Sequence, residues 1–383
     1  MKSPVVRPEY LFSLSLLLGV CALPSTAYAS VVLNGSSNNM DYQVSLVAEH
    51  LSVPWGITFI TSQKLLITQR HGEAVILDIS NNSQTAVKGL PDVTASGQGG
   101  LLDVITEPGY QQPNDWLYFT YSKTIGNQAV TVLARSKLKV DTLTQWQELL
   151  VTHSATPTYR HFGSRITFDQ QGHLFFSVGD RGERDNGQDL TTHAGSILRL
   201  NHDGTVPADN PFVAHKTALP EIWSYGHRNP QGLAFDIDSK QLWASEHGPR
   251  GGDEINLIKK GSNYGWPVTS HGKEYWGPIS VGEAKEKEGI ESPRKVYIPS
   301  IAPGSLLHYT GTAFPGWQGD LFVGALKLEH INHLTLSPEG NITSEERLLL
   351  PLQERIRALV QSPEGWIYFT TDNGNLYRIS PLE

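Results

Sequence analysis

Short runs of alternating hydrophobic and polar residues recur along most of the chain, and each run is bounded by Gly, Asp, Asn or Pro. Sustained helical periodicity is almost absent beyond the N-terminal stretch. The clearest unit covers residues 166–176, where a strand-like run is followed by a turn and then by a run rich in aromatic residues. This pattern predicts an all-β protein built from hairpins.

The unit of strand, turn and aromatic strand occurs six times. The copies cover residues 57–67, 103–119, 166–176, 233–243, 306–323 and 359–369. A period of roughly 45 to 75 residues leaves room for several antiparallel strands per unit, and one small sheet cannot bury both faces alone. The sequence therefore predicts a six-bladed β-propeller, with a pair of β-sandwiches or a parallel β-helix as alternatives. The run at residues 42–47 precedes the first copy, and we expect it to complete the last blade and so to hide an edge strand.

The N-terminal 29 residues have the features of a secretory signal peptide. Lys2 and Arg7 give a basic start, residues 11–23 form a short apolar stretch, and Ala27-Tyr28-Ala29 places small residues at a cleavage site. The apolar stretch is too short to span a membrane comfortably. We expect residues 1–29 to be removed on export and residues 30–383 to form one catalytic propeller domain that is periplasmic or secreted.

Composition narrows the class of partner. The chain carries 30 Lys and Arg against 38 Asp and Glu, a net charge of −8, and the expected mature domain is more acidic by one charge because the leader holds two basic residues and one acidic residue. No long run of one sign occurs, so nucleic acid and anionic membranes are not expected partners. The single cysteine, Cys21, lies in the leader. The mature fold must therefore be stabilised without disulfides. The oligomeric state, monomer or homodimer, stays open.

His161 is the candidate general base. It precedes the first strand of the clearest hairpin unit, and Asp180 follows the second strand. Because a hairpin returns its exit to its entrance, we expect the imidazole and the carboxylate to lie close together. A neighbouring carboxylate fixes the tautomer of an imidazole and raises its basicity, as a base needs near neutral pH. A buried, hydrogen-bonded histidine without catalytic function is the alternative.

Several polar residues lie in loops between the hairpin units, and loops at one end of a propeller surround its axis. Gln98 stands among glycines in residues 96–100, where the backbone can approach a ligand closely; an ordinary glycine turn is the alternative. Four cations occupy comparable loop positions: Arg228, Lys327, Arg355 and Arg357. In an acidic chain, cations that converge on one axis indicate an anionic ligand with several oxygen groups, although each could instead form a surface ion pair.

The densest motif covers residues 246–256 and 261–267. The carboxylates of Asp253 and Glu254, and turn carbonyls freed by Gly and Pro, are the hard oxygen ligands that Ca²⁺ prefers. Zinc would require cysteine or clustered histidine, and no such spacing occurs. A long turn capped by carboxylates is the alternative to a calcium site.

These motifs together resemble the soluble pyrroloquinoline quinone (PQQ) dependent glucose and aldose sugar dehydrogenases, the glucose/sorbosone dehydrogenase family. The resemblance covers essentially the whole mature chain. It is carried by residues 97–103, 161–163, 225–232, 246–266, 324–327 and 355–357. It implies a six-bladed propeller that holds PQQ and calcium at one end of its axis.

The resemblance also implies roles for single residues. The histidine matching His161 is the general base that takes the hydroxyl proton from the anomeric carbon, and the arginine matching Arg228 lies by the quinone carbonyl, where a cation stabilises negative charge. Further positions match cofactor contacts: Gln98, Asn229, Tyr275, Lys327, Arg355 and Arg357. The carbonyls of Gly248 and Pro249 match ligands of the calcium beside the quinone, and Glu254 and the Tyr264 carbonyl match ligands of a second, structural calcium. Arg160 departs from the family pattern, so the substrate preference in that corner stays open.

The sequence thus favours an oxidoreductase that converts aldoses to lactones and passes electrons through PQQ to a small or protein acceptor. A calcium-dependent, lactonase-like hydrolase and a non-catalytic binding propeller are the alternatives, because the fold alone does not decide function. A calcium lactonase would line the axis with Asn, Asp and Glu side chains. The four cations favour the dehydrogenase.

Overall fold

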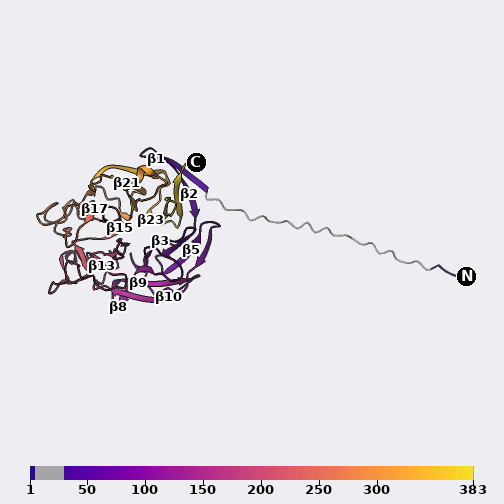
Figure 1. The fold of residues 1–383 in the computed structure, drawn as a ribbon, viewed down its shortest axis with the longest axis horizontal. Helices are drawn as coiled ribbons and strands as arrows, with labels where there is room; N and C mark the ends of the chain where they lie inside the picture. Colours follow the sequence, from indigo (N-terminus) through magenta and orange to yellow (C-terminus); the bar gives the residue numbers. More distant parts are fainter. Residues whose placement is uncertain (5–29, 383) are drawn as a thin grey trace.

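The computed structural model describes residues 1–4 and 30–382. In these ranges the chain forms 25 β-strands and three short 3-10 helices, and it contains neither an α-helix nor any helix long and apolar enough to cross a membrane. The strands make six antiparallel sheets that follow one another around a ring (Figure 1). The predicted six-bladed propeller is confirmed. The predicted signal peptide falls outside the described residues except for residues 1–4.

The first three blades follow the chain in simple order. Blade 1 contains β3 (Pro54–Thr61), β4 (Lys64–Gln69), β5 (Glu73–Asp78) and β6 (Ser83–Ala86). Blade 2 contains β7 (Leu101–Thr106), β8 (Leu117–Ile125), β9 (Gln128–Lys139) and β10 (Thr142–Val151). Blade 3 contains β11 (Ile166–Phe168), β12 (Leu174–Val178), the 3-10 helix η1 (Arg184–Gln188), β13 (Ser196–Leu200) and β14 (Ile222–Tyr225).

The last three blades complete the ring. Blade 4 contains β15 (Pro230–Asp236), β16 (Gln241–Glu246), β17 (Asp253–Ile258) and β18 (Lys295–Tyr297). Blade 5 contains β19 (Pro303–His308), η2 (Pro315–Trp317), β20 (Leu321–Ala325), β21 (His330–Leu336) and β22 (Ile342–Leu348), and η3 (Leu350–Leu352) follows it. Blade 6 contains β23 (Ile356–Gln361), β24 (Ile367–Thr371), β25 (Leu376–Pro381), β2 (Met40–Ala48) and β1 (Ser30–Ser37).

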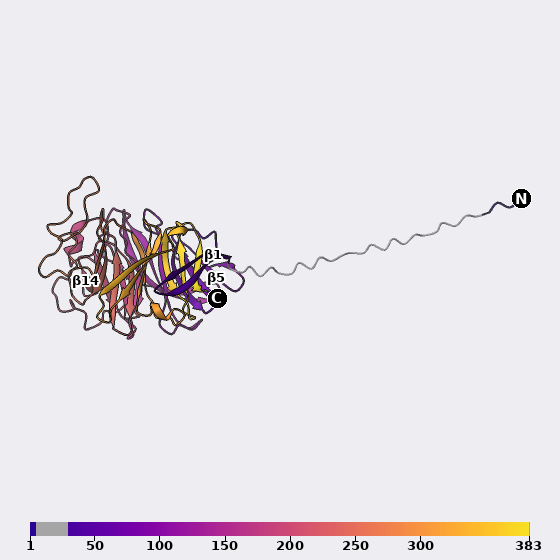
Figure 2. The ribbon, with the colours of Figure 1, turned by 90° about the horizontal axis from the view of Figure 1, so that it is seen from above.

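The six sequence copies are the two innermost strands of the six blades. Each copy pairs as an antiparallel hairpin, for example Thr167 opposite Phe175 in blade 3 and Val360 opposite Tyr368 in blade 6. These strands are covered on both faces by neighbouring blades, so their residues are mostly apolar and buried. Seen from a direction at right angles to the first view, the strands cross the thickness of the disc and the loops lie at its two ends (Figure 2).

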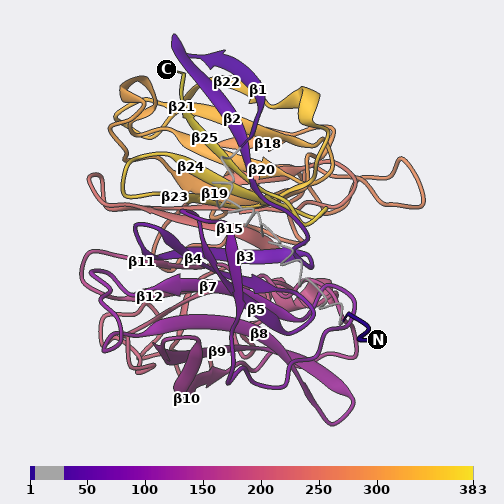
Figure 3. The same ribbon diagram turned by 90° about the vertical axis from the view of Figure 1, so that its right-hand side faces the viewer.

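The ring is closed by the N-terminal strand β2. It pairs antiparallel with β25, with Val44 opposite Ile379, and β1 adds a fifth strand at the outer edge of the same sheet (Figure 3). The expectation for residues 42–47 is therefore confirmed. Closure by the two ends of the chain removes the free edge that an open ring would expose.

Two ends of the propeller are defined by its topology. Because neighbouring strands in each blade are antiparallel, the link from one blade to the innermost strand of the next lies at the same end as the link between second and third strands. We call this end the site end and the opposite end the far end. Just inside the site end, Asp103 and Arg165 pair at 2.7 Å among the innermost strands. A cavity of about 210 Å³ in the axis includes this pair and apolar residues of all six innermost strands.

Candidate functional site

The polar residues singled out in the sequence gather at the site end. Links into innermost strands carry Gln98, His161, Arg228, Asn229 and Arg355, and Arg357 is the second residue of β23. Links between second and third strands carry Asp180, Gly248, Pro249 and Lys327. Glu254 lies at the start of β17, next to this end. Tyr264 and Tyr275 belong to the long connection between β17 and β18, which returns to the site end, where Lys273 pairs with Arg250.

His161 and Asp180 form a buried pair, as the hairpin argument required. The imidazole Nδ1 lies 2.6 Å from Asp180 Oδ1. Since an ionised carboxylate only accepts hydrogen bonds, Nδ1 carries the proton and Nε2 is left with a free lone pair. His161 Nε2 makes no hydrogen bond within residues 1–4 and 30–382, so the arrangement presents an unprotonated ring nitrogen to a substrate.

Backbone and side-chain contacts hold this pair in place. The amide of His161 donates to Gln98 Oε1 at 2.7 Å, which links Gln98 to the pair from the neighbouring blade. Asp180 Oδ1 also accepts from the Gly182 amide at 2.7 Å, and its Oδ2 accepts from the indole of Trp266 at 2.8 Å. Both carboxylate oxygens are thus used, which fixes the orientation of the imidazole.

The charge states of the pair follow from burial and neighbours. Burial lowers the pKa of His161 below its usual value, Asp180 partly offsets this, and Arg228 and Arg160 lower it further. Burial alone would raise the pKa of Asp180, but His161, Arg228 and the Gly182 amide together hold it below its usual value. Near neutral pH the pair is a neutral imidazole beside a carboxylate, which is the state of a ready general base.

Arg228 and Asn229 lie beside this pair. The amide of Asp180 donates to the Arg228 carbonyl at 2.8 Å. The guanidinium of Arg228 donates from Nη1 to the carbonyls of His247 and Gly248, at 3.1 and 2.8 Å. Asn229 Oδ1 accepts from the Gly163 amide at 3.2 Å. The Gly248 carbonyl, one predicted calcium ligand, is therefore already turned toward the polar centre of the site end.

Arg355 and Arg357 share one carboxylate, that of Asp372. Arg357 donates to it from Nε at 2.8 Å and from Nη2 at 3.0 Å, and Arg355 donates from Nε at 2.8 Å. Arg355 also donates to the Leu326 carbonyl at 2.9 Å, which places it beside Lys327. The Lys327 side chain is exposed and forms no ion pair with any residue that the structure describes. The three cations retain a net positive charge despite Asp372.

His247 connects the two groups of cations. Its Nε2 donates to the Pro303 carbonyl at 2.8 Å. Burial, together with the nearby Arg228, His161 and Arg357, lowers the pKa of His247 to about 3, while the hydrogen bond to Pro303 partly offsets this. Arg228, His161 and Arg357 therefore all lie near the His247 imidazole.

A small cavity of about 20 Å³ lies next to Arg228. Its lining includes the carboxyl groups of Glu246 and Glu254 and residues Gly248, Pro249 and Tyr264. Burial, together with the neighbouring Glu246 and Asp253, raises the pKa of Glu254 to about 8, and the hydrogen bond from Asn256 partly offsets this. The buried carboxyl of Glu246, the partly buried carboxyl of Glu254 and several carbonyls are a donor set that suits a hard cation.

The Asp253 carboxylate is not arranged as a metal ligand, which the sequence had predicted. Its Oδ1 accepts from the Gly248 amide and from Ser300 Oγ, each at 2.9 Å, and its Oδ2 accepts from the Ala302 amide at 2.7 Å. These donors use both oxygens to hold the turn that carries Gly248. Asp253 therefore shapes the loop rather than offering a free oxygen.

Tyr275 is the least integrated of the predicted residues. Its side chain is 67 % exposed, and it follows Glu274, which forms a two-point ion pair with Arg184 at 2.7 and 2.8 Å. This ion pair fixes the long β17–β18 connection against η1 of blade 3. Tyr275 thus stands at the rim of the site end, outside the buried network around His161.

Four residues with contacts at the site end carry no function predicted from the sequence: Glu246, His247, Trp266 and Asp372. Glu246, His247 and Trp266 lie in the dense motif, but their partners could be read only from coordinates. Asp372 stands in a Thr-Asp-Asn-Gly turn between β24 and β25, where an aspartate is expected for turn geometry alone. Its contact with two arginines gave no local signal in the sequence.

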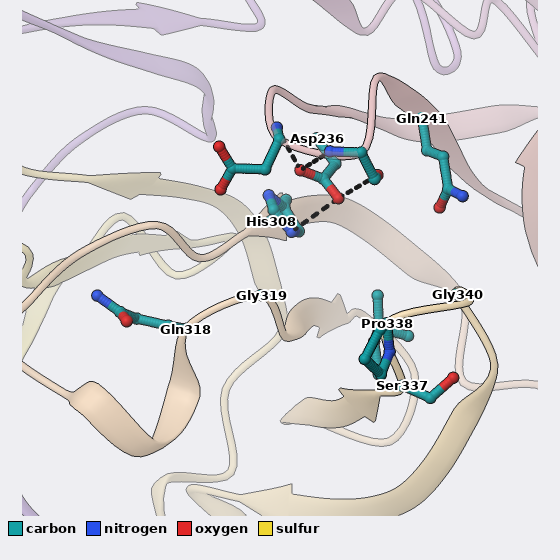
Figure 4. A pocket seen from close by; sticks show the side chains of 11 residues that line it. Asp236, Gln241, His308, Gln318, Gly319, Ser337, Pro338 and Gly340 are labelled. Atoms are coloured by element: carbon teal, nitrogen blue, oxygen red, sulfur yellow. Dashed lines mark hydrogen bonds and ion pairs between the residues drawn. The ribbon is translucent and has the colours of Figure 1, made fainter.

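The far end has a cavity of different chemistry. It measures about 300 Å³ and is lined by Asp236, Asp238 and His308 together with amide and hydroxyl side chains (Figure 4). Asp236 Oδ2 lies 3.7 Å from His308 Nε2. The cavity lining contains neither lysine nor arginine. It therefore does not suit a polyanion, in contrast to the site end.

Comparisons with known proteins agree with the fold and the motifs. The model of the glucose/sorbosone dehydrogenase family matches residues 51–378. Aldose sugar dehydrogenase YliI of Escherichia coli is 38 % identical over 348 residues, which cover 88 % of this chain and 92 % of the relative. Quinoprotein glucose dehydrogenase B of Acinetobacter calcoaceticus is 28 % identical, with 97 % and 95 % covered. The crystal structure of the soluble E. coli aldose sugar dehydrogenase in its apo form superimposes with a TM-score of 0.85 at 35 % identity, covering 89 % of this chain and all of the other.

Proposed function

Because the chain belongs to the glucose/sorbosone dehydrogenase family, we propose that it is a dehydrogenase that oxidises the anomeric carbon of aldose sugars to lactones, with PQQ as electron acceptor and Ca²⁺ as Lewis acid. The observation that carries the proposal is the His161–Asp180 pair lying at the same end of the axis as Arg228, Lys327, Arg355 and Arg357. A base and a group of cations in one place suit removal of a proton beside a polyanionic cofactor.

The charges at the site end fit PQQ, which carries three carboxylates. Arg355 and Arg357 are pre-oriented by Asp372, and Lys327 is free of ion pairs in the described part of the chain. Guanidinium groups bind planar carboxylates with two parallel hydrogen bonds. Gln98 and Asn229 would add amide contacts from neighbouring loops, and Tyr275 would contribute from the rim. When bound, PQQ supplies a two-electron acceptor that no side chain can replace.

The metal proposal rests on the donor chemistry of the small cavity and the turn beside it. Gly248 and Pro249 would hold Ca²⁺ through their carbonyls next to the cofactor, and the carboxyl of Glu254 with the Tyr264 carbonyl would hold a second, structural Ca²⁺. A divalent cation would remove the electrostatic cost of burying Glu254 beside Glu246. Near the quinone, a calcium ion would polarise a carbonyl oxygen as a Lewis acid.

The residues of the chain have distinct roles in the proposed reaction. His161 Nε2 accepts the proton of the anomeric hydroxyl, and the hydrogen on the anomeric carbon leaves with its electron pair to the acceptor, so that a carbon–oxygen double bond forms and the sugar becomes the lactone. Asp180 keeps the Nδ1 proton in place and stabilises the imidazolium that forms. The guanidinium of Arg228 would place a positive charge beside bound PQQ and so favour its reduction.

Two further observations support a dehydrogenase over the alternatives. A calcium-dependent hydrolase would need a cluster of acidic ligands at the axis, and residues 1–4 and 30–382 contain no group of three or more His, Cys, Asp or Glu side chains placed to hold a metal. A binding propeller would not need a neutral, hydrogen-bonded imidazole with a free Nε2. The predicted leader at residues 1–29 would place the reaction in the periplasm or outside the cell.

The test is reconstitution of the purified, cofactor-free protein with PQQ and Ca²⁺. We expect glucose and other aldoses to reduce an artificial dye in a reaction that depends on added PQQ, with aldonolactone as the product. The variant His161→Ala should bind PQQ with unchanged affinity while its turnover falls by about two to four orders of magnitude. His202→Ala, at an exposed histidine in the link between β13 and β14, is the matched control and should keep full turnover.

Two results would contradict the proposal. If no aldose reduces the dye, and if the absorbance spectrum of PQQ does not change on mixing with the protein, the dehydrogenase proposal is rejected. If His161→Ala lost PQQ binding but kept its turnover per bound cofactor, His161 would be a cofactor contact and not the base.

A further inference from the structure

Trp266 contacts the catalytic pair from a distant part of the sequence. Its indole Nε1 donates to Asp180 Oδ2 at 2.8 Å, although 86 residues separate the two positions. Among the described residues, no other donor reaches this carboxylate oxygen. Asp180 is 1 % exposed, so water cannot take the place of the indole without a rearrangement. The loss of this donor would leave a buried, charged oxygen without a partner.

The position of Trp266 is itself tightly defined. Its amide donates to the Gly226 carbonyl at 2.8 Å, and its carbonyl accepts from Gln188 Nε2 at 2.7 Å. Gly187 packs against it so closely that a Cβ at that position would lie 2.4 Å from the Trp266 carbonyl oxygen. These contacts come from blade 3 and from the loop that carries Arg228. The indole is therefore a fixed donor and not a mobile lid.

The same side chain borders the candidate metal cavity. Trp266 lines the small cavity together with Glu254, and the guanidinium of Arg228 lies 5.3 Å from the centre of its ring. One residue thus touches Asp180 on one side and the cavity and Arg228 on the other. The long connection between β17 and β18 brings this contact from blade 4 to the histidine of blade 3.

We propose that Trp266 is a positioning residue for the base: its indole N–H holds one oxygen of Asp180 so that the other oxygen faces His161 Nδ1 and leaves Nε2 directed at the substrate. The consequence for turnover rests on the proposed function. The effect on the imidazole does not, because it is a property of the cofactor-free protein.

The physical expectation follows from the charge on Asp180. A donor at Oδ2 stabilises the negative charge and makes the carboxylate a weaker partner for the imidazole. Without that donor, the charge acts more strongly on His161 and favours its protonated form. The other titratable or charged groups near the imidazole are Arg160, Arg228 and His247, and of these Arg228 also lies against the Trp266 ring, which the phenyl ring of Trp266→Phe replaces.

The experiment is an NMR titration of the cofactor-free protein with ¹⁵N-labelled histidine, in which His161→Ala assigns the resonances. In Trp266→Phe we expect the titration midpoint of His161 to rise by roughly half a pH unit or more. Trp366→Phe changes an indole at the far end in the same way and is the matched control. In the Asp180→Asn background, Trp266→Phe should cause no further change.

A second variant keeps the test valid if Trp266→Phe does not fold. Gln188→Ala removes a contact to the Trp266 backbone without touching His161 or Asp180, and should move the midpoint in the same direction by a smaller amount. An unchanged midpoint in every folded variant would overturn the proposal. If the dye assay succeeds, Trp266→Phe should lower kcat roughly ten- to a hundredfold with little change in KM. A midpoint that shifts in a protein without dye reduction would refute the dehydrogenase and leave the positioning contact standing.

Discussion

Glu246 and Glu254 lie directly opposite each other on β16 and β17, and both line the same small cavity. Asn256 donates to Glu246 Oε1 at 2.9 Å and to Glu254 Oε2 at 3.2 Å, and so bridges two groups that repel each other when both are ionised. Burial and this repulsion raise the pKa of Glu254. The Ca²⁺ that we propose at this cavity would offset the repulsion between these two carboxyl groups.

This pair predicts that calcium stabilises the protein in a pH-dependent way. A carboxyl group whose folded-state pKa is raised contributes stability that is complete below the unfolded value of about 4.3 and is lost as pH rises through the folded value. The Tm of the metal-free protein should therefore fall between about pH 5 and pH 8, and Ca²⁺ should restore it most strongly at the upper end. Thermal unfolding in Ca²⁺ and in chelator measures both effects.

The matched variants for the calcium prediction are Glu254→Gln and Glu339→Gln. Glu254→Gln removes one buried charge, so we expect a higher Tm without metal at pH 8 and little further gain from Ca²⁺. Glu339 lies in a far-end turn and is exposed, so Glu339→Gln should respond to Ca²⁺ as the unaltered protein does. An equal gain from Ca²⁺ in both variants would place the cation elsewhere.

Lys327 should contribute to cofactor affinity through a charge-assisted hydrogen bond. Its side chain is exposed beside Leu326, whose carbonyl accepts a hydrogen bond from Arg355. Lys327→Met should weaken PQQ binding by roughly tenfold, because hydrogen bonds to charged groups contribute about 1.5–3 kcal/mol and an exposed one lies at the low end. Absorbance titration at two salt concentrations measures the affinity and its salt dependence. Lys216→Met, at another exposed lysine, is the control, and an equal loss in both variants would count against a local contact.

The pH dependence of turnover should report the surroundings of His161. The base works when neutral, and burial lowers its pKa, so kcat/KM should stay high below the usual histidine pKa of about 6.5. Asp180→Asn removes the hydrogen bond and the negative charge that raise this pKa. The acidic limb should therefore move to lower pH while kcat falls by roughly two orders of magnitude or more, because the tautomer is no longer fixed. A limb that stays in place would indicate that another group titrates.

Sequence reasoning recovered the parts of this molecule that repeat or that lie close in the chain. The six hairpins were visible because their strands are buried on both faces, and His161 and Asp180 were linked because one hairpin separates them. Contacts made by long connections were not visible. The donation from Trp266 to Asp180 depends on the path of the β17–β18 connection, and no local pattern encodes that path.

A buried charge pair below the site offers a test of the fold that needs no activity. Arg165 Nη1 donates to Asp103 Oδ1 at 2.7 Å, and its Nε and Nη2 donate to the carbonyls of Gln231 and Gly304 at 3.0 and 2.9 Å. Asp103 Oδ2 accepts from the Ile166 amide at 2.8 Å. These contacts connect the innermost strands of blades 2, 3, 4 and 5 around the axis.

Removing one partner of this pair should destabilise the propeller strongly. Asp103→Asn leaves the Arg165 guanidinium buried without its counter-charge, so we expect the free energy of unfolding in urea to fall by about 3–5 kcal/mol. The pair of Lys64 and Asp78 at the surface of blade 1 is 3.9 Å apart and serves as the control. Asp78→Asn should cost about 0–1 kcal/mol.

The double variant Asp103→Leu with Arg165→Met separates charge from packing. If the cost of Asp103→Asn comes from an uncompensated charge, removing both charges should cost clearly less than the sum of the two single changes. If the costs instead add, the loss reflects packing in the axis, and the pair has no special electrostatic role. The contacts of Arg165 join strands of four blades. A cost below the sum would therefore mean that the charges of one buried ion pair set the spacing of the loops that carry His161, Arg228 and Gln98.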